Sequence, residues 1–206
     1  DRQVMVNAVV RNNKGEVIGT SSKEVSIKAG STINVSQNVP VSNPSLWTPD
    51  TPTLYKAHLS ITENGKQTDQ TEETFGIRTI AYSADKGFLL NGKPLNLNGG
   101  CLHHDNGILG AAAFDQAEIR KVRLMKDAGF NAVRTSHNHP SEAFLHACDS
   151  IGMLVVDEAF DGWRTAKTTY DYSTLIDEHW QEDVAALVLR DRNHPSIFCW
   201  SVGNEV

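Results

Sequence analysis

Apolar and polar positions alternate with a period of two through the first 77 residues of the chain. The alternation is clear in Val4–Val10 and Tyr55–Ile61, and shorter runs follow it at Val25–Ile27 and Ile33–Val35. Turn-forming Asn and Gly residues separate these runs. Short strands at this spacing predict an antiparallel β-sandwich of immunoglobulin type. The pattern accounts for about six strands against the seven of such a fold, so an opening strand could be missing. Trp47 is expected to fill the sandwich interior, with a sugar platform as the alternative.

A different pattern begins near Phe88. Short apolar strands are predicted at residues 95–98, 131–134, 153–157 and 197–201. Apolar residues at helical spacing predict three helices between them, from Asp115 to about Gly129, from Pro140 to Ile151 and from Ile176 to Arg192. A capping box of Asp115 and Glu118 is expected to open the first helix. Alternating strands and helices with continuous apolar strands predict a parallel sheet covered by helices.

Polar residues follow each of the four predicted strands. The segments are Gly99–Asp105, Arg134–His139, Asp157–Asp161 and Asn204–Glu205. The carboxyl ends of parallel strands meet at one edge of a sheet, which is where an α/β barrel keeps its active site. The sequence therefore predicts a functional site at this edge.

The length of the second part limits how much of a barrel it can form. A complete (β/α)8 barrel takes about 250 residues, and residues 78 to 206 have room for four strands. The predicted fold class is multidomain β + α/β. An immunoglobulin-like β-sandwich domain at residues 1–77 is followed, at residues 78–206, by the first four β/α units of a truncated TIM barrel.

The composition of the chain limits the kinds of molecule that it is expected to bind. The 206 residues are 39% hydrophobic with a net charge of −6, and no basic block suggests nucleic acid. No apolar stretch approaches the ~18 residues of a membrane span. Cys101, Cys148 and Cys199 lack the spacing of a metal site and are expected to be reduced thiols.

Three local motifs resemble glycoside hydrolase family 2. Asp191–Ser196, followed by Trp200–Glu205, is similar to the acid/base signature of that family. Asn131–His137, followed by Cys148-Asp149, is similar to its other signature, and Phe75–Arg78 with Phe88–Pro94 resembles its passage from sandwich to barrel. The stretch from His103 to Asp115 is similar to a bacterial β-galactosidase-like branch.

The resemblance implies roles for particular residues. Glu205 would be the general acid/base, kept protonated by poor solvation or by an ionised partner. Asn204 would hydrogen-bond the 2-hydroxyl group of the sugar. The other residues expected to contact substrate are His103, Arg134, His137, Asp157, Asp105 and Trp163, with Asp161 beside them.

The chain departs from the family at two places. Asn138-His139 stands where the family usually has Tyr-Pro. Gly162 and Arg164 stand where some β-galactosidases have magnesium ligands, so neither a metal nor another cofactor is expected.

The implied activity is retaining hydrolysis of terminal β-linked sugars, with β-galactosidase first and β-glucuronidase or β-mannosidase as alternatives. A non-catalytic carbohydrate-binding or scaffold module is the alternative from another class. Residues 1–206 alone are expected to be inactive, because the nucleophile would lie beyond Val206. They are also expected to self-associate through the open edges of strands 95–98 and 197–201.

Three residue assignments stay open. Glu205 could be an ordinary exposed carboxylate at a strand end. Arg134 could form a structural ion pair with Asp157 or Glu158. His103, His104, His137 and His139 could form a zinc site, although no HExxH or cysteine spacing supports one.

Overall fold

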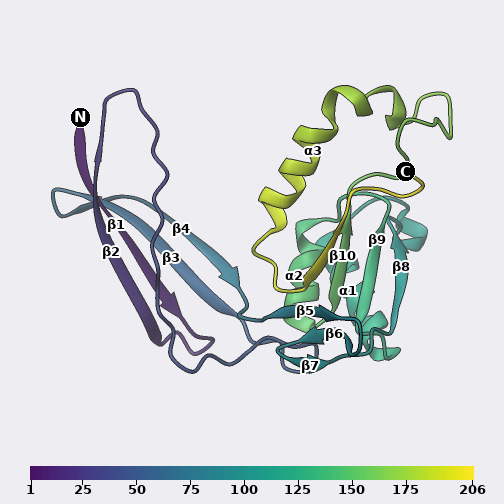
Figure 1. The fold of residues 1–206 in the computed structure, drawn as a ribbon, viewed down its shortest axis with the longest axis horizontal. Coiled ribbons are helices and arrows are strands. Elements are labelled where there is room, and N and C mark those ends of the chain that lie inside the picture. The colour runs from purple at the N-terminus through teal and green to yellow at the C-terminus, as the bar shows by residue number, and fades with distance from the viewer. The chain divides into compact units, whose positions relative to one another are not determined.

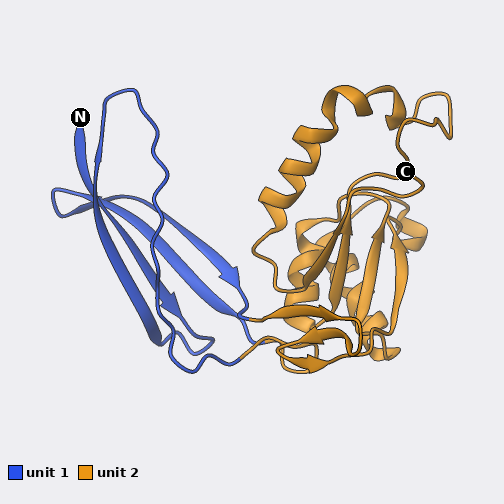
Figure 2. Cartoon of the chain, in the orientation of Figure 1, with its two compact units in different colours: residues 1–45, 53–77 blue, residues 46–52, 78–206 orange.

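A computed structural model describes all of residues 1–206, and the chain divides into two compact units (Figure 2). The first unit contains residues 1–45 and 53–77. The second contains residues 46–52 and 78–206.

Four antiparallel strands make up the first unit. They are β1 (Arg2–Arg11), β2 (Val17–Ile27), β3 (Tyr55–Glu63) and β4 (Lys66–Phe75), in the sheet order β2-β1-β3-β4 (Figure 1). Val4, Ala8 and Val10 of β1 are buried, and so is Tyr55 at the start of β3. The predicted strands around Val4–Val10, Val25–Ile27 and Tyr55–Ile61 are confirmed. Their period of two puts alternate side chains on one face of the sheet.

The strand predicted at Ile33–Val35 is wrong, since residues 28–45 form neither helix nor strand. This segment contacts the sheet through side chains instead of a backbone ladder. Gln37 Nε2 donates to the backbone oxygen of Val6 at 2.8 Å, and a Cβ at Gly19 would come within 2.8 Å of Val39. The glycine therefore lets the segment lie close to β2.

Trp47 does not fill the sandwich. It is fully buried within the second unit, where its indole nitrogen donates to the backbone oxygen of Asp149 at 2.8 Å. The prediction failed because a buried tryptophan needs a partner for its N–H, and sequence position does not say which unit supplies it.

A small antiparallel sheet, which the sequence did not predict, opens the second unit. It contains β5 (Ile80–Ser83), β6 (Gly87–Leu90) and β7 (Lys93–Pro94). Nearby side chains reach the backbone of the last parallel strand. Arg78 donates to the oxygens of Pro195 and Ile197, and the Tyr82 hydroxyl group donates to the oxygen of Phe198 at 3.2 Å.

The parallel sheet contains β8 (Gly99–His103), β9 (Ala132–Ser136), β10 (Leu154–Glu158) and β11 (Ile197–Ser201), in the order β11-β10-β9-β8. The helices are α1 (Asp115–Asp127), α2 (Glu142–Ile151) and α3 (Ile176–Asp191), with short 3-10 turns η1 (Gly107–Leu109) and η2 (Tyr172–Thr174). Val122 of α1, Leu145 of α2 and Val155 of β10 share one buried cluster. Helices α1 and α2 therefore cover the same face of the sheet (Figure 1).

Two local predictions in this unit were wrong. The first parallel strand is Gly99–His103 and not 95–98, although the glycine pair reads as a turn. A Cβ at Gly99 would lie 2.9 Å from the backbone oxygen of Ala132, so glycine allows close pairing with β9. The capping box also fails, because Phe114 is the N-cap of α1 and makes no side-chain cap. Glu118 is instead buried and accepts from Asn106 at 2.7 Å.

No helix of the structure has both the length and the apolar character needed to cross a membrane.

Candidate active site

The four parallel strands bring their polar carboxyl ends to one edge of the sheet, as the sequence predicts. Glu158 ends β10 and pairs in register with Ser201, which ends β11. Arg134 lies on β9, and His103 ends β8 next to Ser136. Parallel pairing in register thus gathers residues that are up to about a hundred positions apart in the sequence.

Glu158 is fully buried at the centre of this group. Its carboxylate accepts from Arg134 Nε at 2.8 Å, from Arg134 Nη2 at 2.9 Å and from Ser201 Oγ at 2.7 Å. His137 Nδ1 lies 2.7 Å from the same carboxylate. Burial alone would raise the pKa of Glu158, but the bonds from Ser201, His137 and Arg134 lower it below its ordinary value. Glu158 is therefore an ionised anchor with both oxygens occupied.

Arg134 connects this anchor to Asn204. Its Nη2 donates to Asn204 Oδ1 at 3.0 Å, and the backbone nitrogen of Asn204 donates to the oxygen of Phe160 at 2.8 Å. These contacts hold the amide group of Asn204 in one orientation. Arg134 thus forms an ion pair with Glu158 and not with Asp157, and its predicted contact with substrate stays a prediction.

The two predicted pocket histidines lie together. The ring centroids of His103 and His137 are 5.1 Å apart, and the rings meet edge to face. His137 Nε2 is also 3.9 Å from Asp161 Oδ1. Both rings therefore border the same group of polar side chains.

Glu205 lies in a different environment from the one expected. Its side chain is 71% exposed, and its Oε2 forms an ion pair with Lys167 Nζ at 2.8 Å. The same ammonium group lies 2.9 Å from Asp161 Oδ1. The structure thus brings Glu205 next to Asn204 and Asp161, but the expected poor solvation of its carboxylate is absent.

Asp157 does not belong to this group, so its predicted contact with substrate does not fit the structure. Successive residues of a strand point to opposite faces, and Glu158 occupies the site face. Asp157 is fully buried on the other face, and neither of its carboxylate oxygens has a hydrogen-bond donor. Burial, followed by the nearby Asp191 carboxylate, raises the pKa of Asp157 to about 8.

Asp105 and Trp163, both predicted to contact substrate, lie in different surroundings. Asp105 accepts from the backbone nitrogen of Gly107 at 2.5 Å and borders a surface hollow with η1 and α1, away from Glu158. Trp163 packs against Phe160 and Trp180, with ring centroids 5.6 and 5.8 Å away. It also lies beside Gly203, whose ideal Cβ would be 3.6 Å from the indole ring. Trp163 therefore lies beside the segment that carries Asn204, whereas Asp105 lines a separate hollow, and the substrate contacts of both residues stay predictions.

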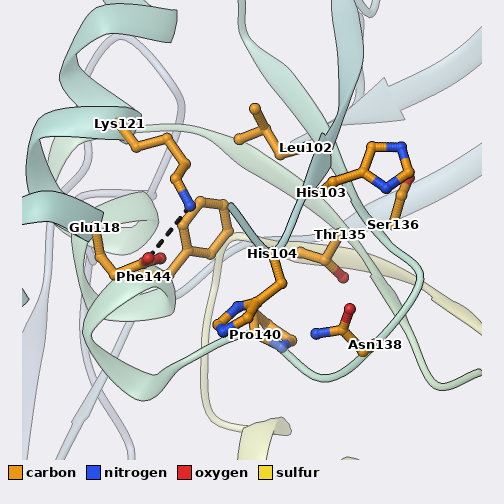
Figure 3. Close-up of a pocket in the computed structure, with 10 residues that line it drawn as sticks. All are labelled: Leu102, His103, His104, Glu118, Lys121, Thr135, Ser136, Asn138, Pro140 and Phe144. Carbon is orange, nitrogen blue, oxygen red and sulfur yellow. Dashed lines mark hydrogen bonds and ion pairs between the residues drawn. The ribbon is translucent and has the colours of Figure 1, made fainter. Parts of the chain in front are cut away.

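A small cavity lies between the ends of β8 and β9 and helices α1 and α2 (Figure 3). Its volume of about 20 Å³ has room for a water molecule but not for a sugar. The Lys121 amine points to the carboxylate of Glu118 at 3.2 Å across it. The cavity is therefore too small to serve as a sugar-binding pocket.

Sequence reasoning missed Ser201 and Lys167 as members of the site, and treated Glu158 only as an ion-pair partner. Ser201 could have been found, because a strand-end residue in register with Glu158 shares its face. Lys167 carries no such signal, since it lies in a long loop after β10.

A four-stranded parallel sheet with polar strand ends, preceded along the chain by an antiparallel β-domain, defines the class of proteins that join a β-domain to an α/β barrel. The family model "Glycosyl hydrolases family 2, TIM barrel domain" matches residues 83–206, and the model "Glycosyl hydrolases family 2" matches residues 1–78. The chain belongs to glycosyl hydrolases family 2, and its fold class is the predicted immunoglobulin-like sandwich followed by the start of a TIM barrel.

Known proteins resemble the chain over most of its length. It is 40% identical to a β-galactosidase of Bacteroides ovatus over 206 residues, which cover 100% of this chain and 24% of that protein. It is 43% identical over 192 residues to a putative β-glucuronidase of Formosa agariphila, and the match covers 93% of this chain and 18% of that protein. The crystal structure of a family 2 member from Bacteroides cellulosilyticus superposes on this chain with a TM-score of 0.94 at 45% sequence identity. The superposition covers 96% of this chain and 26% of that protein. The chain thus spans between about a fifth and a quarter of the length of these relatives.

Proposed function

We propose that the protein carrying this chain is a retaining glycoside hydrolase that removes terminal β-linked galactose. The observation that carries the proposal is the group formed by Glu158, Arg134, His137 and Asn204, with Glu205 directly after it. In this proposal Asn204, held by Arg134, binds the 2-hydroxyl group of the sugar. His103 and His137 donate to other hydroxyl groups.

Glu205 is the proposed general acid/base. It protonates the leaving oxygen and then takes a proton from the attacking water. Lys167 Nζ lies 2.8 Å from Glu205 Oε2, so bound substrate must displace the ammonium group from Glu205 while it keeps its second partner, Asp161. A second carboxylate about 5 Å away would act as nucleophile. Glu158 is not suited to that role, because Arg134, His137 and Ser201 occupy its oxygens.

A neutral sugar fits this site better than a uronic acid. Arg134 uses its Nε and Nη2 on Glu158, and Lys167 is paired with Asp161 and Glu205. The described part of the site therefore offers no free cation for the carboxylate of a glucuronide. The putative β-glucuronidase among the relatives supports the alternative. Parallel assays of an aryl β-galactoside and an aryl β-glucuronide separate the two.

The test of the acid/base uses a protein with the complete barrel. Glu205→Ala should lower kcat on a disaccharide by about 10²–10⁴-fold, the usual contribution of general acid–base catalysis. Aryl glycosides with good leaving groups should still form the glycosyl-enzyme, and added azide should speed its release.

Glu178→Ala is the matched control, because Glu178 is an exposed carboxylate on α3. It should leave turnover unchanged. Near-normal disaccharide hydrolysis by Glu205→Ala would refute the assignment. We expect residues 1–206 alone to hydrolyse no aryl β-galactoside, because Asp161, the carboxylate beside Glu205, is paired with Lys167 and the oxygens of Glu158 are occupied.

A further inference from the structure

Helix α2 and the segment that leads into β11 are joined by one buried carboxylate. Asp149 of α2 accepts from the backbone nitrogen of Ser196 at 3.1 Å, and its other oxygen lies 2.5 Å from His194 Nδ1. Asp149 is buried, and the His194 side chain is only 10% exposed. This contact lies where β11 begins, at the opposite end of the strand from Asn204 and Glu205 (Figure 1).

His146 adds a third group to this pair. It lies on α2 three residues before Asp149, so the two side chains share one face of the helix. The ring centroids of His146 and His194 are 5.0 Å apart. One donor atom from each of His146, Asp149 and His194 lies within 4.8 Å of the other two. His146 is exposed, so an ion from solvent can reach the group.

We propose that His146, Asp149 and His194 bind a divalent transition-metal ion of the zinc type. Two imidazole nitrogens and one carboxylate oxygen form a donor set that suits such ions, and water completes the coordination on the exposed side. With metal bonds of about 2.0–2.1 Å to both ligands, His194 Nδ1 and the Asp149 oxygen must move apart to about 3.3 Å. The metal then takes the place of the proton that the two groups now share.

The position of this site indicates a structural role. The bottom face of an α/β barrel contributes to stability and not to chemistry. A metal here links α2 to the segment 192–196 and so connects the second and fourth β/α units. The proposal is independent of the proposed glycosidase activity.

The test titrates Zn²⁺ and Co²⁺ into the protein at its natural length, without an affinity tag. Calorimetry should detect one bound ion that is lost in His146→Gln, or held with a Kd at least about tenfold higher, the scale on which even outer-shell losses weaken metal binding. Co²⁺ should give visible absorption bands of a tetrahedral nitrogen–oxygen site. Saturating Zn²⁺ should raise the Tm of the parent protein and not that of His146→Gln.

His179→Gln is the matched control. His179 is also an exposed helical histidine beside a carboxylate, 4.0 Å from Glu178, and its loss should change nothing. His146→Cys should keep the ion and add a thiolate-to-cobalt band in the near ultraviolet. Equal affinity in the parent protein, His146→Gln and His179→Gln overturns the proposal, and so does the absence of any binding by the folded parent.

Discussion

Two adjacent carboxyl residues at the end of β10 carry opposite protonation states. Glu158 faces the site, where Arg134, His137 and Ser201 keep it ionised. Asp157 faces the other side, where it meets Asp191, whose own oxygens are held by Arg190 at 2.6 Å. Without a donor of its own, Asp157 avoids an uncompensated buried charge by keeping its proton. The alternation of side chains along a single strand therefore produces both environments.

The raised pKa of Asp157 predicts a pH-dependent effect of Asp157→Asn. Between the unfolded pKa of about 3.9 and the folded value of about 8, the folded state holds a proton that the unfolded state releases. The stability contributed by this proton is complete below pH 4 and is lost as pH rises to 8, by at most about 1.4 kcal/mol per pH unit. Asparagine carries no such proton, so the variant should gain stability relative to the parent as pH rises. Urea unfolding midpoints at pH 5 and pH 8 measure this.

Asp50→Asn is the control, because Asp50 is exposed. The effect of Asp50→Asn on the urea unfolding midpoint should be small and equal at pH 5 and pH 8. A stability difference between Asp157→Asn and the parent that stays constant from pH 5 to pH 8 would contradict a raised pKa of Asp157.

At the scale of elements, α2 has a complete set of local signals. The Ser141 side chain caps its first turn by accepting from the nitrogen of Phe144 at 3.2 Å. Gly152 ends it in the left-handed region at φ 85°, and a Cβ there would collide with the backbone of Pro49. Helix α1 lacks such a cap and begins after Phe114. The predicted start of α2 was correct because its cap is made within four residues. The predicted start of α1 at Asp115 was also correct, but the capping box expected from Asp115 and Glu118 does not form.

Ser141→Ala should destabilise the protein by about 1 kcal/mol, because one orphan amide of the first turn loses its acceptor. Ser150→Ala on the same helix is the control. Ser150 only bonds back to the backbone oxygens of His146 and Ala147, so its removal should be neutral or slightly stabilising. Chemical denaturation of both variants tests this. Equal effects of the two substitutions would mean that the cap contributes nothing.

At the scale of the whole molecule, the parallel sheet has two open edges, β8 and β11. The β11 edge is partly covered, because Arg78 and Tyr82 donate to the oxygens of Ile197 and Phe198. Trp200 and Val202, further along, remain 37% and 51% exposed. An uncovered strand edge with apolar neighbours favours pairing with another chain.

We therefore predict that residues 1–206 form dimers or larger species through β8 and the end of β11. Trp200→Lys should shift the population towards monomer, since a charged side chain on an edge strand opposes pairing. Tyr170→Lys removes an aromatic side chain that is 93% exposed and belongs to the loop between β10 and η2, not to an edge strand, so it should have no such effect. Sedimentation equilibrium at micromolar concentration is the measurement. A monomeric parent chain would show that the remaining edge is already protected.

The sequence by itself determined strands β1 and β3, the alternation of strands and helices from α1 to β11, and the edge where the polar residues gather. These features depend on the spacing of apolar residues, which has a period of two in strands and 3.6 in helices, on the helix cap at Ser141, and on the residues that follow each strand. All of these signals lie within a few residues of the chain. Tertiary structure decided which residues face one another. It placed Trp47 in the second unit, turned Asp157 away from the site, and brought Lys167 to Glu205. It also paired Gly99 with Ala132, where a missing side chain allows contact between strands. Such contacts join residues far apart in the chain, so no local pattern contains them.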